Sequence, residues 1–440
     1  MTGARQLGMA SLRLEMGTFP VHEVRFSGQT RWDAGRLDID RDAMIAEIRR
    51  DPRVLGAELE LLRPGESVRV VNVRDLIEPR FKVSGPGTCY PGICGRVNQT
   101  VGEGRTHRLS GIAIVESADT VMYEGNDGWL DRWLDMSGPV ADAAPTGGLL
   151  NLTLILKIAP GLVAQERSDA AHRAALDLAD RLAGATVGLT PPEMRVYELA
   201  RPATPLPKVV YITCLRSPQH YAGSLTASWV SIYGMSRLTP PWLLHPNELL
   251  DGAIGGPASS HSSTTTWVMT NNPIVDELYR GHGIDHDFAG VIAIRTRWSA
   301  QEEKDLTAMQ AAKLARLLGA EGAVITYDAG GNDFMEVIET VQACERLGIK
   351  TVFVTTESPP EAEGPPLLMP LPEANAIVST GIGRPEGRPL VVPVPARVLG
   401  GDELMATSAR PLERVPANAA MTFHRWGDHY GLGTVSCIEH

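Results

Sequence analysis

"KVVYITCL", at residues 208–215, is the stretch that decides the fold of the second half of the chain. It is an almost uninterrupted apolar run of strand length, which is typical of a strand buried on both faces. Four runs of the same kind follow it: GVIAIRT (290–296), GAVITYD (322–328), KTVFVTTE (350–357) and AIVSTG (376–381). Helical patterns lie between them, at 299–318 and 334–347. This alternation predicts a doubly wound, mostly parallel α/β domain over residues 208–395.

The helix at 299–318 carries a start signal and a large apolar side. Ser299 and Glu302 have the spacing of a capping box, so we expect the helix to begin there. Its buried side is expected to hold the large apolar residues, which are Leu306, Met309, Leu314 and Leu317.

A helix is also predicted before the Pro-rich stretch. Ser168 is a suitable cap for its start and Gly184 for its end. The apolar stripe between them consists of Ala171, Ala175, Leu178 and Leu182.

The first part of the chain has a different texture, with short runs bounded by Gly and Pro. Several of them alternate apolar with polar residues, as expected of half-buried strands: LRLEM (12–16), RLDID (36–40), SVRVVNV (67–73) and GIAIVE (111–116). We therefore expect a β-rich N-terminal domain at 1–190, a Pro-rich linker at 191–207 and an irregular C-terminal tail at 396–440. The two domains together give an α+β protein.

Composition excludes several classes of protein. The formal net charge of −11, without any Lys/Arg run, disfavours nucleic-acid binding, which needs a basic face. No apolar stretch reaches the length of a membrane span, and the first residues lack the apolar core of a secretory signal. Five scattered cysteines indicate reduced thiols and hence a cytoplasmic protein.

The segment GGPASSHSSTTTW, at 255–267, is rich in hydroxyl residues and has two interpretations. In the first, the chain processes itself: a side-chain hydroxyl attacks the preceding carbonyl, and elimination and hydrolysis leave a pyruvoyl group that captures an amine. Ser259, Ser260 and His261 supply the nucleophile and the acid–base group. In the second, the segment is a surface loop with a solvated histidine. The residues leave both open.

Cys89 and Cys94 form a second candidate site within SGPGTCYPGICG (84–95). They could be a redox pair, two metal ligands or buried thiols. Their C-x4-C spacing matches neither the zinc pattern nor the thioredoxin pattern, which favours structural thiols and no metal.

A third candidate site is the sequence TYDAGGNDFMEV at 326–337, which joins a buried strand to a helix. Backbone N–H groups at such a junction bind anions or carboxylates in doubly wound folds. Asp328, Asn332 and Asp333 would be its polar side chains, and a simple turn is the alternative.

Long stretches of the sequence resemble one family. They are LRLEMGTFPVHEVRF (12–26), SVRVVNVRDLIEPRFKVSGPG (67–87), VGEGRTHRLSGIAIV (101–115), DMSGP (135–139), LDGAI (250–254) and NNPIVDELYRGHGIDHDFAGVIA (271–293). In this order they resemble the component B proprotein of glycine, sarcosine and betaine reductases, which is similar to the D-proline reductase proprotein. The resemblance runs from about residue 11 to about residue 390.

The resemblance implies a self-cleaving chain whose new N-terminal cysteine becomes a pyruvoyl group. It also implies a partner subunit, with a catalytic thiol or selenocysteine, that breaks the C–N bond of the substrate. The processing cysteine of the family falls between DGAI (251–254) and NNP (271–273), and this chain has no cysteine between Cys214 and Cys344. Either Ser259 or Ser260 replaces it, or the chain stays intact. We favour an intact chain.

The resemblance therefore predicts an oxidoreductase subunit in a hetero-oligomer, acting on a small amino acid or an N-methylated derivative. In a processed chain, Ser259 or Ser260 would form the pyruvoyl and His261 would move protons. In an intact chain the same cleft would bind substrate without a Schiff base, with Asp328, Asn332 and Asp333 helping to hold it.

Two alternatives to this subunit remain. One is an unprocessed, non-catalytic partner that has a structural or substrate-presenting role. The other is a thiol- or metal-dependent enzyme built on Cys89 and Cys94.

Overall fold

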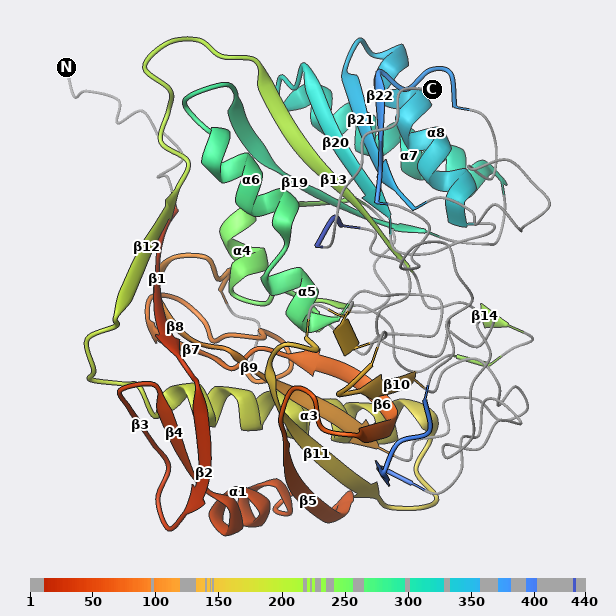
Figure 1. Cartoon of the computed structure of the whole chain (residues 1–440). Coiled ribbons are helices and arrows are strands. Elements are labelled where there is room, and N and C mark those ends of the chain that lie inside the picture. Colours follow the sequence, from red (N-terminus) through yellow and green to blue (C-terminus); the bar gives the residue numbers. More distant parts are fainter. Residues whose placement is uncertain are drawn as a thin grey trace.

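The chain folds as a mixed α/β protein in which sheets of the first half lie below a layered second half (Figure 1). The computed structural model describes residues 12–95, 99–118, 132–138, 141–142, 144, 146–216, 220–221, 224–225, 231–234, 241–255, 265–296, 301–327, 333–356, 371–380, 393–401 and 430–432. Among the described helices, none combines the length and the apolar character that a membrane span requires.

The second half is built on a six-stranded sheet. Its strands, in spatial order, are β17 (Trp242–Leu244), β19 (Asp287–Thr296), β13 (Lys208–Arg216), β20 (Gly322–Tyr327), β21 (Lys350–Thr355) and β22 (Ala376–Ser379). All neighbours pair in parallel except β17, which is antiparallel to β19. Each of the five apolar runs is a strand. The parallel strands extend in both directions from β13, which is the order of doubly wound sheets.

Helices cover both faces of this sheet, which explains its uninterrupted apolar strands. On one face, Val210 and Ile212 of β13 pack with α7 (Gln301–Leu317) and α8 (Asp333–Arg346). On the other face, Tyr211 and Leu215 pack with three helices of the layer nearer the first half, α4 (Pro246–Leu250), α5 (Thr266–Thr270) and α6 (Pro273–Gly281).

The predicted buried side of α7 is wrong for three of its four residues, and only Leu314 packs against the core. Leu306, Met309 and Leu317 are exposed, and the core contacts come instead from Ala308, Ala311, Ala312 and Ala315. Small side chains allow α7 to lie close to α8 and the sheet, so here residue size decides which face is buried. The expected cap at Ser299 lies outside the described residues.

The first half contains three sheets. One has the order β12 (Glu193–Glu198), β1 (Arg13–Pro20), β8 (Gly104–Ser110) and β7 (Arg80–Ser84). The second has the order β10 (Arg132–Asp135), β6 (Val68–Ile77), β9 (Ile112–Ala118), β11 (Leu150–Ile158) and β5 (Val54–Leu62). The third joins β2 (Glu23–Ser27), β4 (Arg36–Asp40) and β3 (Arg31–Asp33), and leads into α1 (Arg41–Ile48).

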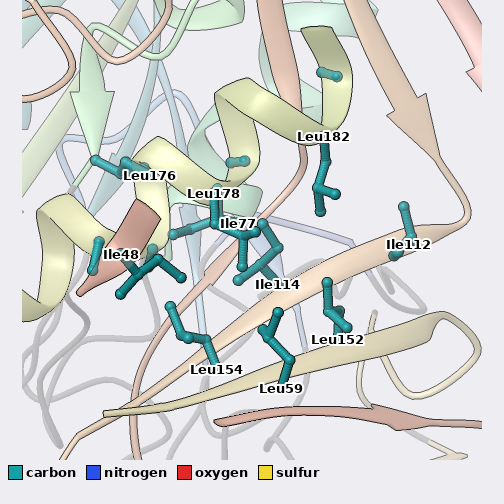
Figure 2. Close-up of a cluster of buried hydrophobic side chains, with 14 of the residues drawn as sticks. Ile48, Leu59, Ile77, Ile112, Ile114, Leu152, Leu154, Leu176, Leu178 and Leu182 are labelled. Atoms are coloured by element: carbon teal, nitrogen blue, oxygen red, sulfur yellow. The ribbon is translucent and has the colours of Figure 1, made fainter. Parts of the chain in front are cut away.

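Helix α3 (Ala164–Gly184) packs along the second sheet, as Figure 2 shows. Leu176, Leu178 and Leu182 face strand residues such as Ile77, Ile114 and Leu154 across one core. The stripe predicted from the sequence is fully buried. The predicted cap is wrong, because the helix begins one turn earlier and Ser168 lies inside it.

Two expected irregular stretches contain paired strands. The stretch expected as a linker, 191–207, includes β12, which pairs with β1. The expected tail, 396–440, begins with β23 (Arg397–Leu399), which pairs with β6, and its Tyr430 is buried against the α4–α6 layer. Backbone pairing and burial thus fix the described parts of both stretches to the fold.

Candidate functional site

The hydroxyl-rich segment, residues 255–267, is bounded on both sides by elements that the structure describes. Strand β18 (Ile254–Gly255) leads into it and pairs with β16 (Ser231–Ile232), and α5 begins at Thr266, the residue before its last. Ser259, Ser260 and His261 lie outside the described residues. A Cβ on Gly255 would lie 2.9 Å from Oγ1 of Thr266. The two ends of the segment therefore approach each other closely enough to require glycine.

Asp75 of β6 holds the start of α5. Its Oδ1 accepts a hydrogen bond from the backbone N of Thr266 at 2.9 Å, and its Oδ2 accepts one from Oγ1 of Thr266 at 2.5 Å. Asp75 is fully buried. A carboxylate from the first half of the chain thus binds the residue at which the hydroxyl-rich segment ends.

Glu116 and His172 join Asp75 in one buried cluster. The β6–β9 register places Asp75 opposite Glu116, after a bulge that begins at Val73. His172 of α3 has Nδ1 at 2.7 Å from Glu116 Oε2 and at 3.8 Å from Asp75 Oδ2. Strand pairing and the helix across the sheet bring together residues that are far apart in sequence.

Arg74 completes the cluster. Its Nε donates to Glu116 Oε1 at 2.9 Å, and its guanidinium also donates to Oγ of Ser168 at 2.6 Å. Ser168 and His172 are four residues apart on α3, so both face the sheet at the same place. This contact gives Ser168 a role other than the predicted cap.

Burial and neighbouring charges set the protonation of the cluster. Burial raises the pKa of Asp75 to about 7. Burial alone would raise the pKa of Glu116, but His172 and Arg74 together hold it below its usual range. Burial alone would lower the pKa of His172, but Glu116 and Asp75 outweigh it and raise it. The cluster therefore binds protons on His172 and Asp75 up to near-neutral pH.

A small cavity lies beside this cluster. Its lining includes His172, Tyr90, Gly255 and Thr266, and its volume of about 10 Å³ leaves room for about one water molecule. His172 Nε2 is buried and has no hydrogen-bond partner among the described residues. The cavity thus connects a titratable nitrogen with both ends of the hydroxyl-rich segment.

Asp75, Glu116 and His172 also have the composition of a metal site, with ligand atoms within 4.8 Å of one another. Each carboxylate oxygen already accepts a hydrogen bond, from Thr266 in Asp75 and from Arg74 or His172 in Glu116. An arginine in contact with the set opposes a further cation. We interpret the cluster as an acid–base network.

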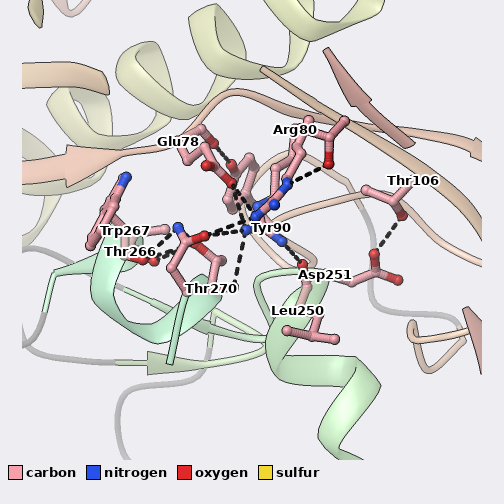
Figure 3. Close-up of polar contacts among 12 residues, drawn as sticks. Glu78, Arg80, Tyr90, Thr106, Leu250, Asp251, Thr266, Trp267 and Thr270 are labelled. Atoms are coloured by element: carbon pink, nitrogen blue, oxygen red, sulfur yellow. Dashed lines mark hydrogen bonds and ion pairs between the residues drawn. The ribbon is translucent and has the colours of Figure 1, made fainter. Parts of the chain in front are cut away.

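A second buried network fixes α4 and α5 to the first half, as Figure 3 shows. Arg80 donates to the backbone oxygens of Leu250 at 2.5 Å and Thr270 at 3.0 Å, and pairs with Glu78 at 2.6 Å. Tyr90 donates to the backbone oxygen of Glu78. These contacts hold the chain on both sides of the hydroxyl-rich segment.

Asp251 anchors the same region through a buried ion pair with Lys82. It also accepts hydrogen bonds from Thr106 Oγ1 at 2.5 Å and from the backbone N of Gly102 at 2.7 Å. Asp251 is fully buried and Lys82 nearly so. The turn after α4 is therefore held by charge as well as by packing.

The candidate thiol pair lies under α3. Cys89 is buried in the core and Cys94 is half-buried against it; both are free thiols. The acidic side chain of Asp177, on α3, adds to the effect of burial on the pKa of Cys94. Burial raises the pKa of both thiols well above their usual range. This environment is that of structural thiols rather than reactive ones.

We expect these thiols to resist alkylation. Iodoacetamide reacts with the thiolate, so the native protein at about pH 8 should leave Cys89, Cys94, Cys214 and Cys344 unmodified, whereas denatured protein should add five labels. Peptide mass spectrometry measures this directly. Rapid labelling of Cys94 in the native protein would contradict the structural interpretation.

The predicted polar loop after β20 is only partly described. Asp328 and Asn332 lie outside the described residues, and Asp333 is the first residue of α8. The loop joins the end of β20 to the start of α8, at the junction predicted from the sequence. Its role in binding stays a prediction.

The acid–base cluster was not predicted from the sequence. The available signal was the presence of Arg74, Asp75 and Glu116 in strands whose other residues are mostly apolar. Buried charges in strands are rare unless they are paired, so such residues mark a site.

Fold and site define a mixed α/β protein with a buried acid–base cluster beside a hydroxyl-rich segment. A family model described as glycine/sarcosine/betaine reductase component B subunits matches residues 12–413. The chain belongs to this family.

Curated relatives agree with this assignment. The chain is 34% identical over 380 residues to "Glycine reductase complex component B subunits alpha and beta" of Peptoclostridium acidaminophilum, covering 84% of this chain and 86% of the relative. It is 33% identical to the protein of the same description from Acetoanaerobium sticklandii, covering 79% of each. It is 32% identical to "Betaine reductase complex component B subunit alpha" of P. acidaminophilum, covering 84% of each. No solved structure matches the chain.

Proposed function

We propose that the chain is a component B subunit of a reductase complex that cleaves the C–N bond of a small amino acid or an N-methylated derivative. The observation that carries this proposal is the Asp75–His172–Glu116 cluster, which is bonded to Thr266 and borders the cavity at both ends of the hydroxyl-rich segment. Amine chemistry needs a positioned group that exchanges protons near neutral pH, and His172 meets that need.

A cysteine-derived pyruvoyl does not fit this chain. The cysteines nearest in sequence to residues 255–267 are Cys214 of β13 and Cys344 of α8, and both are buried in the core between the parallel sheet and α7 and α8. Neither can replace a thiol in the segment. We therefore assign no step to that group and propose that the chain acts intact, without a Schiff base, which suits a quaternary amine.

The described residues supply position, charge and exclusion of water. Arg80 and Lys82 fix the backbone at 250–251 and at Thr270, on both sides of the segment. Asp75 fixes the start of α5, and Glu116 orients His172. The small volume of the cavity leaves little solvent beside the titratable nitrogen. Such a fixed and nearly dry environment strengthens electrostatic interactions among the groups that border it.

We propose that the attacking group comes from a partner, because the four described cysteines are free, protonated and in other parts of the fold. We propose a hetero-oligomer with a subunit that carries a catalytic thiol or selenocysteine. Free thiols throughout the described chain suit the reducing cytoplasm.

A second candidate function is a non-catalytic subunit that presents substrate to such a partner. The absence of a cysteine between Cys214 and Cys344 favours it. The two candidates differ in whether the acid–base cluster takes part in the reaction.

Amine release by the assembled complex tests the proposal. The chain would be combined with the thiol or selenol subunit of a glycine, sarcosine or betaine reductase complex and a dithiol reductant, with glycine, sarcosine or betaine as substrate. We expect ammonia, methylamine or trimethylamine to form only when both subunits are present. Equal release by the partner subunit alone would refute both the catalytic and the presenting role.

A further inference from the structure

Helix α7 presents large apolar side chains on its outer face. Leu306, Met309 and Leu317 are 52%, 41% and 82% exposed, whereas the alanines on the opposite side of the helix are buried against the sheet and α8. The outer face of a surface helix normally carries polar residues. Three large apolar residues gathered on one face therefore mark a contact surface for another protein.

Two charged residues continue this face. Glu302, Leu306, Met309 and Lys313 are separated by four, three and four residues, which is the spacing of the contact stripe in paired helices. Together with Leu317 they lie within about 80° of the helix circumference and form what we call the α7 stripe. Glu302 and Lys313 are exposed, and within the described part of the chain neither forms an ion pair.

The order of charges along the α7 stripe determines how it can pair with a copy of itself. In a parallel pair, Glu302 would face Glu302 of the second copy and Lys313 would face Lys313, and like charges oppose association. In an antiparallel pair, Leu306 meets Met309 of the second copy and Glu302 meets its Lys313. This arrangement has two-fold symmetry, so each contact occurs twice and the assembly closes as a dimer.

We infer that two copies of the chain form a two-fold dimer by antiparallel pairing of their α7 stripes. Helix α7 lies on the opposite face of the parallel sheet from α5, where the hydroxyl-rich segment ends (Figure 1). The dimer contact therefore lies on a different face from that segment, and the inference does not rest on the proposed function. One pair of helices is smaller than a standard interface, so we expect a Kd of about 1–100 µM.

Sedimentation velocity of the purified full chain, over a concentration series that spans this range, tests the dimer. We expect the wild type to shift from monomer to dimer as its concentration rises. Met309→Glu places a charge at the centre of the stripe and should raise the Kd by at least about tenfold. Ile284→Glu is the matched control, because Ile284 is 72% exposed but lies outside α7, and it should leave the Kd unchanged.

Exchange of the two charges tests the antiparallel arrangement. Lys313→Glu or Glu302→Lys alone brings like charges together at both ends of the stripe and should raise the Kd by about tenfold. The double variant restores opposite charges and should return the Kd to within about threefold of the wild-type value. Positions 302 and 313 are about 16 Å apart along one helix, beyond the reach of a direct ion pair. Recovery therefore requires contact between two chains.

The remaining outcomes overturn the inference. A wild-type chain that stays monomeric up to about 100 µM does so. A dimer that Met309→Glu leaves intact forms through another surface, and a double variant that does not recover excludes the antiparallel pairing. Circular dichroism shows whether each variant is folded, and the charge variants decide the question if Met309→Glu is not.

Binding of the thiol or selenol subunit distinguishes the other occupant of the α7 stripe. If the chain is monomeric alone and Met309→Glu weakens its binding to that subunit, the stripe belongs to the hetero-oligomer. That result overturns the inference while the reductase assignment stands. Loss of amine release by a wild-type complex would instead overturn the reductase assignment and leave the dimer untouched.

Discussion

Replacing Asp251 by alanine is expected to lower the free energy of unfolding by about 3–5 kcal/mol, because it leaves the ammonium of Lys82 buried without its partner. Thr106 and the backbone N of Gly102 lose their acceptor at the same time. Urea unfolding measures the change.

A double variant isolates the buried charge as the cause. Lys82→Met in the Asp251→Ala background removes that charge, and we expect it to restore about 1–3 kcal/mol. Glu277→Ala, which breaks an exposed pair with Arg280, should change stability by less than about 1 kcal/mol. If the double variant were no more stable than Asp251→Ala, the loss would come from packing and hydrogen bonds alone.

Replacing Asp75 by asparagine is expected to stabilise the protein, and increasingly so as pH rises. The pKa of Asp75 is raised from 3.8 to about 7 by burial, so the folded state binds one more proton than the unfolded state between about pH 4 and 7. Ionising this buried group above that window costs stability, and asparagine does not ionise. Between about pH 5 and pH 8.5 the advantage of the variant should grow by about 3 kcal/mol.

The directions of the pKa shifts of His172 and Glu116 determine how their contributions to the free energy of unfolding change with pH. The pKa of His172 is raised, so its contribution is present below about pH 6.5 and is lost as pH rises through its folded value. The pKa of Glu116 is lowered, so its contribution is present above about pH 4.5 and is lost in acid. Glu116→Gln should therefore destabilise at neutral pH. Urea unfolding of the wild type, Asp75→Asn and Glu116→Gln at several pH values checks these directions. A stability advantage of Asp75→Asn that does not depend on pH would contradict them.

These expectations bear on function. An ionisable group that lowers stability at neutral pH, in a cluster beside a cavity, is better explained by acid–base work than by a structural role. The same residue holds the first residue of α5. Stability and the proposed chemistry therefore depend on one carboxylate.

The parallel sheet could be predicted because its central strand β13 is buried on both faces and so consists mostly of apolar residues in sequence. The buried face of α7 could not, since Ala308, Ala311 and Ala315 form it while the larger Leu306 and Leu317 point outward. A prediction from apolar periodicity favours large apolar residues for the buried face of a helix. Close packing of α7 on its neighbours instead requires small residues there.

The sequence pointed to a candidate segment, and its role as the site stays a prediction. The resemblance pointed to residues 255–267, and the described flanks, Gly255 and Thr266, border the cavity. Asp75, Glu116 and His172 were missed because each looks ordinary in its own segment. Only the β6–β9 register and the placement of α3 across it bring them together.

The measurement that tests the central claim most directly is the intact mass of the purified protein before and after phenylhydrazine. An intact subunit without a pyruvoyl group predicts one chain near 47.4 kDa that gains no hydrazone. Two fragments that sum to the chain, one of them gaining a hydrazone, would show that Ser259 or Ser260 forms a pyruvoyl and would contradict the account.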